Sequence, residues 1–129
     1  MATQGKLKVT EENNIVIVSF LDVAFLDETS IKELGDELEG VVNKKPGIHL
    51  VINFSNIDYL SSAVLGRLAK IHKLVKKNGG LLKLCSIKNN ILQVFKITKL
   101  DKIFEIHPDQ SKAIASFKPA SGGFKFWKK

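Results

Sequence analysis

Two adjacent serines, Ser61 and Ser62, stand where a buried strand is expected to end and a helix to begin. A serine hydroxyl at a helix start accepts a hydrogen bond from an unpaired backbone N–H group, so either residue could simply cap the helix. The same position tolerates a phosphate group, because the positive end of the helix dipole lies there. The residue types alone leave both interpretations open.

Catalysis by either serine is not expected. A serine nucleophile needs a base within hydrogen-bonding reach and, at a strand-to-helix elbow, flanking glycines that permit a sharp turn. The stretch from Leu60 to Val64 contains no glycine, and nothing nominates a partner histidine. The three histidines, His49, His72 and His107, are too scattered in sequence to form a local metal-binding pattern. We therefore expect a protein that is not an enzyme and that holds no metal or cofactor.

Two further side chains invite a chemical role but are better explained structurally. Cys85 ends an apolar run without a histidine or cationic neighbour that would lower its thiol pKa, so we expect a small buried hydrophobic residue. His72 lies at the edge of an apolar helix stripe, which favours a partly buried histidine whose hydrogen bonds are satisfied. No glycine-rich phosphate loop follows any predicted strand, so nucleotide phosphates have no cradle.

Hydrophobic spacing predicts the elements on either side of the serines. The run His49–Asn53 has the length and β-branching of a buried strand. A helix is expected from Ala63 to Asn78, because apolar side chains recur on one of its faces and basic side chains crowd the other. The glycines after Asn78 then end this helix.

The beginning of the chain predicts a β-hairpin followed by a helix. Residues 7–9 and 15–20 are expected to pair across a turn at Asn13 and Asn14. The first helix starts either at Asp27, or at Ser30 with Glu33 as its capping-box partner, and it ends before Pro46. Further strands are expected at residues 81–85 and 103–106, and further helices at 89–96 and 109–117.

This alternation of strands and helices predicts the fold class. Crossover connections favour an α/β domain with a mainly parallel mixed sheet of about five strands, about four helices and an N-terminal antiparallel hairpin. A single domain is expected over residues 1–117, and residues 118–129 form a basic aromatic tail that we expect to be flexible.

Composition narrows the class of protein. The chain has 129 residues, one cysteine and a formal net charge of +7. One cysteine excludes an internal disulfide bond and fits the cytoplasm, and no apolar run is long enough to span a membrane. The second predicted helix is basic, but no aromatic side chains are interleaved to stack bases, so we expect a solvated surface and no direct contact with nucleic acid. A module that binds lipid or another polyanion through this helix and the tail remains a further alternative.

Several segments together resemble one known family. They are residues 51–54, the stretch Leu60-Ser61-Ser62-Ala63-Val64-Leu65-Gly66, the basic helix with its Asn78-Gly79-Gly80 end, and residues 82–85 and 94–104. In order and spacing they resemble a STAS domain of the bacterial anti-sigma factor antagonist type. The resemblance spans Ile15 to Ala115.

The resemblance implies a switch that works through protein binding. Members of this family bind an anti-sigma factor, which is also a serine kinase, and phosphorylation of one serine releases that partner. In the family pattern an aspartate precedes the phosphorylated serine. Aligned without gaps, Ser61 takes the aspartate position and Ser62 the phosphoacceptor position, with Ser61 as the fallback acceptor.

The resemblance also nominates a surface for the partner. This surface surrounds the acceptor serine and the starts of the first two helices, where Leu26 and Asp27 match a second family segment. A STAS interaction module without phosphorylation is the alternative, and a monomer or weak dimer is expected. The candidate partner-binding residues are Asp27, Ser61, Ser62, Ala63, Leu65 and Gly66.

Overall fold

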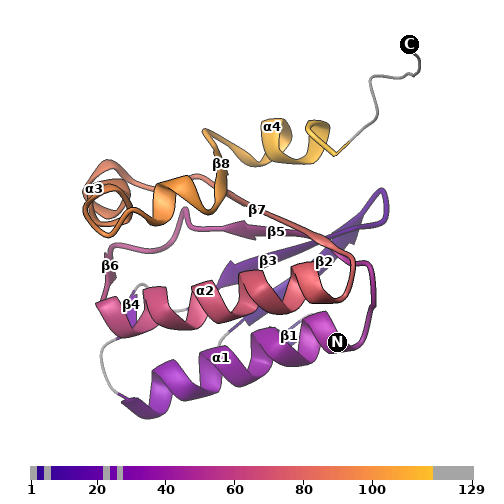
Figure 1. The fold of residues 1–129 in the computed structure, drawn as a ribbon, viewed down its shortest axis with the longest axis horizontal. Coiled ribbons are helices and arrows are strands. Elements are labelled where there is room, and N and C mark those ends of the chain that lie inside the picture. Colours follow the sequence, from indigo (N-terminus) through magenta and orange to yellow (C-terminus); the bar gives the residue numbers. More distant parts are fainter. Residues whose placement is uncertain (1–2, 5–6, 22–23, 26–27, 118–129) are drawn as a thin grey trace.

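A six-stranded mixed sheet with strand order β1-β2-β3-β5-β7-β8 forms the framework of the protein (Figure 1). The computed structural model describes residues 3–4, 7–21, 24–25 and 28–117. The strands of the sheet are β1 (Thr3–Gln4), β2 (Leu7–Glu12), β3 (Ile15–Phe20), β5 (His49–Asn53), β7 (Leu81–Cys85) and β8 (Glu105–His107). The helices are α1 (Glu28–Asn43), α2 (Ser62–Lys77), α3 (Asn89–Ile97), the 3₁₀ turn η1 (Leu100–Lys102) and α4 (Gln110–Ala115).

The sheet has the topology predicted from the sequence, with one short strand added. β2 and β3 pair antiparallel, whereas β3, β5, β7 and β8 are parallel to one another. Asn13 and Asn14 form the hairpin turn with φ of 55° and 67°, a left-handed conformation that asparagine tolerates better than most residues. The predicted strand at residues 7–9 is longer than expected, and β1 covers its outer side.

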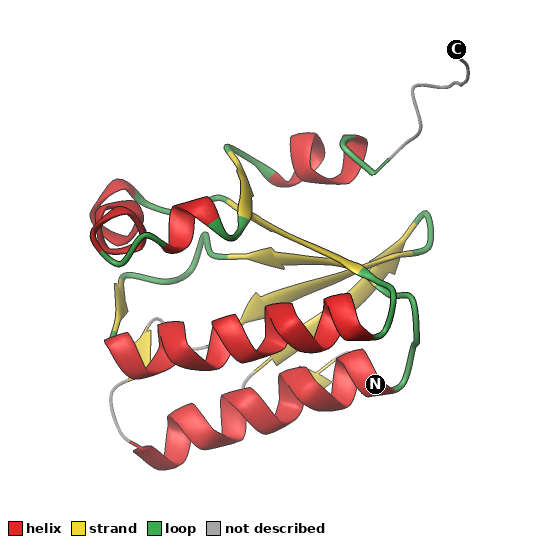
Figure 2. Cartoon of the chain, viewed as in Figure 1, coloured by secondary structure: helices red, strands yellow, loops and turns green. Residues whose placement is uncertain are grey.

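Helices cover the two faces of the sheet unequally. Figure 2 shows α1 and α2 side by side on one face, while the short helix α4 lies on the other. The main hydrophobic core lies between the sheet and the face covered by α1 and α2, and Phe20, Phe54 and Phe95 are fully buried in it. The ring of Phe54 contacts the rings of both Phe20 and Phe95. A smaller core on the opposite face contains Ile17, Val51, Cys85, Ala113 and Ile114 among its members.

Several helices and strands begin or end at other residues than the sequence predicted. The first helix begins at Glu28, so the alternative start at Ser30 is wrong. The last strand begins at Glu105 and not at residue 103, because the preceding residues form η1. The last helix is shorter than predicted, and Asp109 precedes it as an N-cap whose carboxylate accepts the Lys112 N–H at 2.8 Å.

A second, two-stranded sheet was not predicted. β4 (Ala24–Phe25) and β6 (Tyr59–Leu60) pair in parallel just before α1 and α2 begin. Since each strand leads into a helix, this pairing holds the starts of the two helices next to each other (Figure 1). The expected tail at residues 118–129 lies outside the described residues.

Candidate functional site

Ser61 is the N-cap of α2. Its backbone is extended, with φ of −87° and ψ of 162°, and its Oγ accepts a hydrogen bond from the Val64 N–H at 3.4 Å. Its carbonyl oxygen accepts from the same N–H at 3.1 Å. The Val64 N–H, which lies in the first turn and lacks the usual helical acceptor, is therefore shared between the hydroxyl and the carbonyl oxygen of Ser61.

Ser62 has a different environment. It is the first residue of α2 and its side chain is exposed. No hydrogen bond joins its hydroxyl to any described residue. Because the hydroxyl stands at the positive end of the helix dipole and faces solvent, it is free to be modified without breaking a contact of the fold.

A groove of about 300 Å³ opens beside this serine, between the first turns of α1 and α2. Ile31 and Ala63 contribute apolar surface, and Lys32 and Arg67 bring positive charge to its wall. The ammonium group of Lys32 is 3.0 Å from the carboxylate of Asp36, whereas Arg67 makes no ion pair with a described residue. This arrangement offers a partner a shallow surface with a half-buried arginine in its wall.

The other nominated residues divide into exposed and buried ones. Ala63 and Gly66 are exposed, and a Cβ atom added to Gly66 would meet no atom within 4 Å. Leu65 is only 2% exposed and belongs to the main core, so the expectation that its side chain contacts a partner is wrong. Helical geometry points it inward, whereas Ser62 and Gly66, four residues apart, share the outer face. Asp27 lies outside the described residues.

The family can be identified by comparison with known proteins. The family model of the STAS domain matches residues 6–113. This protein belongs to the STAS domain family. The putative anti-sigma factor antagonist BtrV of Bordetella bronchiseptica is 30% identical over 95 residues, which cover 74% of this chain and 81% of that relative.

Other comparisons agree with this assignment. The anti-sigma-B factor antagonist of Bacillus subtilis is 37% identical over 60 residues, 46% of this chain and 55% of the relative. The solved anti-sigma-factor antagonist (STAS) domain protein of Planctomyces limnophilus superposes with a TM-score of 0.77 at 20% identity, covering 85% of this chain and 96% of that one. The names of the curated relatives describe regulators.

An exposed tyrosine, which the sequence did not nominate as a site residue, lies just before the two serines in this STAS domain. Tyr59 in β6 is 55% exposed. The preceding residue, Asp58, forms an ion pair with Lys88, and its carbonyl oxygen accepts a hydrogen bond from the Asn90 amide at 3.1 Å. The sequence does not indicate whether such a tyrosine is exposed, because its exposure depends on the contacts that hold Asp58 against Lys88 and α3.

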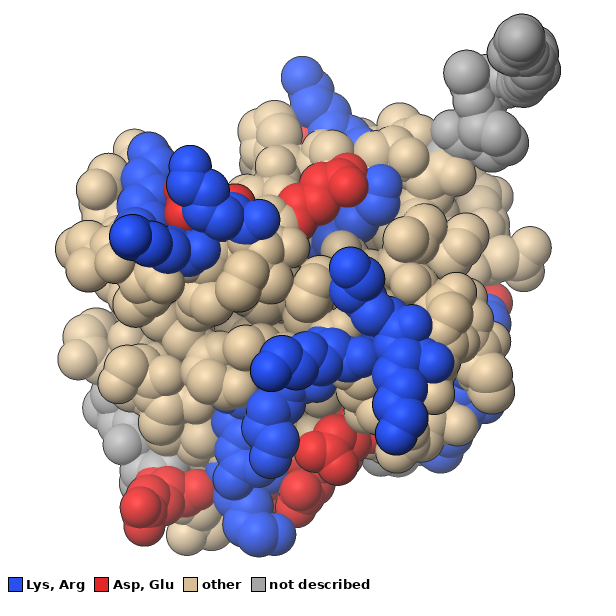
Figure 3. All heavy atoms as spheres, viewed as in Figure 1, with Lys and Arg blue, Asp and Glu red and all other residues tan. Residues whose placement is uncertain are grey.

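The outer face of α2 continues away from Ser62 as a basic surface. Figure 3 shows Lys and Arg side chains gathered over this helix. Lys70, Lys73 and Lys77 are exposed and make no ion pair with a described residue. The predicted basic face is therefore present in the STAS domain, and it lies on the same side of the helix as Ser62.

The remaining candidate side chains are explained by packing. Cys85 is fully buried, as predicted, and burial raises the pKa of its thiol. His72 was expected to have its hydrogen bonds satisfied, and this is wrong, since its buried Nδ1 atom has no partner among the described residues. Its ring instead contacts the ring of Phe104, with centroids 5.2 Å apart. Within the described ranges, no cluster of acidic, histidine and cysteine side chains suits a metal ion, and no helix is long and apolar enough to cross a membrane.

Proposed function

We propose that this STAS domain is an anti-sigma factor antagonist, that it binds an anti-sigma factor with serine kinase activity, and that phosphorylation of Ser62 releases that partner. In this proposal the protein acts in the cytoplasm by binding alone, without catalysis. The curated relatives named as anti-sigma factor antagonists support the class of partner. The observation that carries the proposal is the exposed Ser62 hydroxyl at the start of α2.

The neighbouring serine explains why Ser62 is the better acceptor. Ser61 is half-buried and its Oγ already accepts the Val64 N–H. Phosphorylating Ser61 would convert the capping hydroxyl into a phosphate ester and force a bulky dianion into a half-buried position. Phosphorylating Ser62 leaves the cap in place, and the helix dipole stabilises the added charge. Ser62 is therefore the primary site and Ser61 the fallback.

Phosphorylation at this position would act on the interface and leave the fold intact. A phosphoserine adds about −1.5 to −2 charges and three acceptor oxygens. A partner surface that fits a neutral hydroxyl against Ala63 and Gly66 would have to accommodate this charge at close range. Like-charge contact and desolvation at an interface cost several kcal/mol, so binding weakens by orders of magnitude.

The small side chains on the outer face of α2 support close approach by a partner. Ser62, Gly66 and Ala69 follow one another along this face, so a partner can reach the helix backbone. Tyr59 adds an exposed aromatic side chain beside them, and aromatic residues are enriched in the centres of protein interfaces. We propose that these residues form the contact surface, with the groove near Ala63 and Arg67 at its edge.

The test uses candidate anti-sigma factor kinases from the same organism. Each purified kinase is incubated with this protein and ATP, and phosphate is mapped by mass spectrometry. We expect one phosphate on Ser62, its loss in Ser62→Ala and its retention in Ser61→Ala. Kinase binding by Ser62→Asp should be weaker by about tenfold or more, whereas the uncharged Ser62→Asn, of similar size, should bind nearly as well as the original protein.

Two outcomes would contradict the switch. If no kinase that binds the protein phosphorylated either serine, the proposed regulation would be ruled out, whereas the proposed binding would stand. Equal weakening by Ser62→Asp and Ser62→Asn would show that shape and not charge controls the interface.

A constitutive STAS interaction module is the second candidate. The residue before Ser62 is a serine that caps the helix, where the family pattern has an aspartate, so an acidic neighbour for kinase recognition is missing. Asp58, the nearest preceding acidic residue, is engaged by Lys88. A partner that stays bound in the presence of ATP and a competent kinase would favour this candidate.

A further inference from the structure

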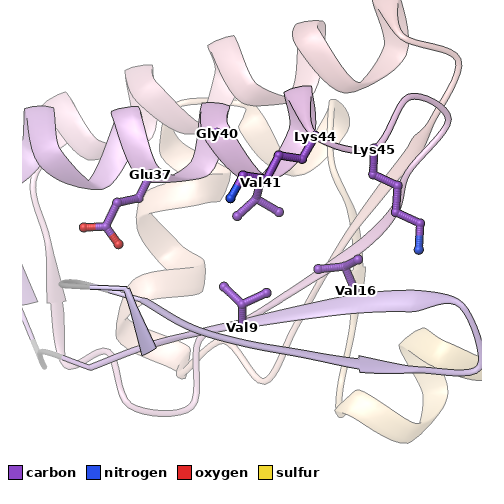
Figure 4. A pocket seen from close by; sticks show the side chains of 7 residues that line it. All are labelled: Val9, Val16, Glu37, Gly40, Val41, Lys44 and Lys45. Atoms are coloured by element: carbon purple, nitrogen blue, oxygen red, sulfur yellow. The ribbon is translucent and has the colours of Figure 1, made fainter. Parts of the chain in front are cut away.

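A second groove lies at the other end of α1, where that helix passes over the β2–β3 hairpin. It encloses about 450 Å³, within the range of about 300–1,000 Å³ that is typical of small-molecule sites. Figure 4 shows Val9 and Val16 pointing up from the strands and Val41 pointing down from the helix. Most of the accessible wall is apolar, and no residue of this groove belongs to the site around Ser62.

Gly40 keeps this groove open. It lies in the interior of α1, where glycine costs about 1 kcal/mol relative to alanine. The other interior glycine of the helix, Gly35, has a packing reason, because a Cβ atom there would be 3.0 Å from the side chain of Arg67. A Cβ atom at Gly40 would meet nothing within 4 Å. A larger residue at position 40 would therefore extend into the open space of the groove.

The charges around the groove differ between its ends. Glu37 stands at one end and Lys45 at the other, whereas the Lys44 side chain runs back along the helix and places its nitrogen over the middle of the groove, near Val41 (Figure 4). The ammonium group of Lys45 is 2.9 Å from the carboxylate of Glu11, so its charge is already compensated. Lys44 is exposed and makes no ion pair with a described residue. The groove thus combines an apolar floor with the ammonium group of Lys44, which pairs with no carboxylate of the described residues.

We propose that this groove binds a single-chain, medium-length fatty carboxylate. The hydrocarbon chain lies between α1 and the hairpin, against Val9, Val16 and Val41, and the carboxylate pairs with the ammonium group of Lys44. Burial of the chain supplies most of the affinity, since each methylene removed from water contributes about 0.8 kcal/mol. This site is independent of the proposed switch at Ser62.

The test is a titration of the isotope-labelled full chain, followed by backbone amide NMR shifts. Decanoate, kept below its micelle concentration, should give saturable shifts at Val9, Gly40, Val41 and Lys44. Acetate should give none, because it has the head group without the chain. Lys44→Met should weaken decanoate binding by about two- to fivefold, as expected for an exposed ion pair, and should leave binding of neutral decanol unchanged.

A steric variant provides the matched control. Gly40→Leu should abolish saturable binding, whereas Gly66→Leu, in another helix interior with equally open space, should retain it. Both replace a helical glycine, so a general gain in helix stability affects them alike. Absence of saturable shifts with decanoate, or equal binding by the Gly40→Leu protein, would overturn the proposal. Shifts of the same amides on dilution without ligand would assign the groove to a second copy of the chain and overturn it as well.

Discussion

The backbone of Ile48 approaches Gly80 so closely that a Cβ atom on Gly80 would lie 2.3 Å from the Ile48 carbonyl oxygen. Both partners are held in place, since the Ile48 oxygen accepts the Leu81 N–H at 2.9 Å and the Gly80 N–H donates to the Val75 oxygen at 2.9 Å. We predict that Gly80→Ala lowers the free energy of unfolding by about 2 to 3 kcal/mol, as overpacking does elsewhere. Urea unfolding followed by circular dichroism measures this.

Gly66→Ala is the control for that variant. Gly66 lies in the interior of α2, and an added methyl group meets open space. Alanine should therefore raise the free energy of unfolding by up to about 1 kcal/mol, because it is the better helix former. If both alanine variants destabilised the protein equally, the close approach of Ile48 would not be the cause.

The two serines should separate stability from signalling. Ser61→Ala removes the hydrogen bond to the Val64 N–H and is expected to cost about 0.5 to 1 kcal/mol of stability, the lower part of the range for lost caps. Ser62→Ala should change stability by less than about 0.5 kcal/mol, as exposed substitutions usually do. Parallel thermal and urea melts check this, and a larger loss in Ser62→Ala would contradict the free hydroxyl.

A buried lysine should make the protein sensitive to acid. The side chain of Lys83 is only 9% exposed. Its ammonium group lies 2.9 Å from the Glu105 carboxylate and 2.8 Å from the Ser116 Oγ. The hydrogen bond from Lys83, assisted by His107 at 2.6 Å, lowers the pKa of the Glu105 carboxyl. A lowered pKa means that this stability is present above the ordinary glutamate pKa and is lost as the pH falls through the folded-state value.

Glu105→Gln should therefore weaken the protein at neutral pH and flatten its acid response. We expect a loss of about 1 to 2 kcal/mol at neutral pH, moderated by the exposure of the Glu105 side chain. Lys83→Met should cost less, because it removes the buried charge and leaves a carboxylate that solvent can reach. Unfolding free energies measured from neutral pH to below the glutamate pKa test both variants, and equal acid slopes in all three proteins would refute the role of this pair.

His72 should lower the stability of the folded protein at mildly acidic pH, for a different reason. Burial, followed by the charge of Lys76, lowers the pKa of its imidazole. The unfolded chain therefore binds a proton more readily, and stability falls as the pH drops below the ordinary imidazole pKa of about 6.5. We predict that His72→Leu removes this decline and keeps the contact with Phe104, as measured by melting temperature across the pH range of histidine titration.

Local patterns in the sequence were enough to predict most of the elements. The apolar run at β5 and the apolar stripe of α2 were placed within one residue of their observed bounds. Their periodicity reflects burial on one face, which is a local property of the chain. The last strand was misplaced because the isoleucine and phenylalanine at residues 103–104 have strand propensity, yet the chain forms the turn η1 just before them.

The candidate site depended on the fold in a different way. The serines and the start of a helix were apparent from residue types and spacing, but Ser61 and Ser62 have almost identical sequence environments. Only the backbone at residue 61 decided which hydroxyl caps α2 and which faces solvent. The same helical geometry turns Leu65 into the core, although Ala63 and Gly66 close to it in sequence are exposed.

The sequence by itself determined the alternation of elements, the family resemblance and the presence of a serine at a helix start. Only the tertiary structure decided that β4 pairs with β6, and hence that the beginnings of α1 and α2 lie together beside Ser62. The groove at Gly40 likewise exists only because α1 crosses the hairpin at that point. Contacts between segments far apart in the chain are set by packing of the whole core, and no local pattern of residue types encodes them.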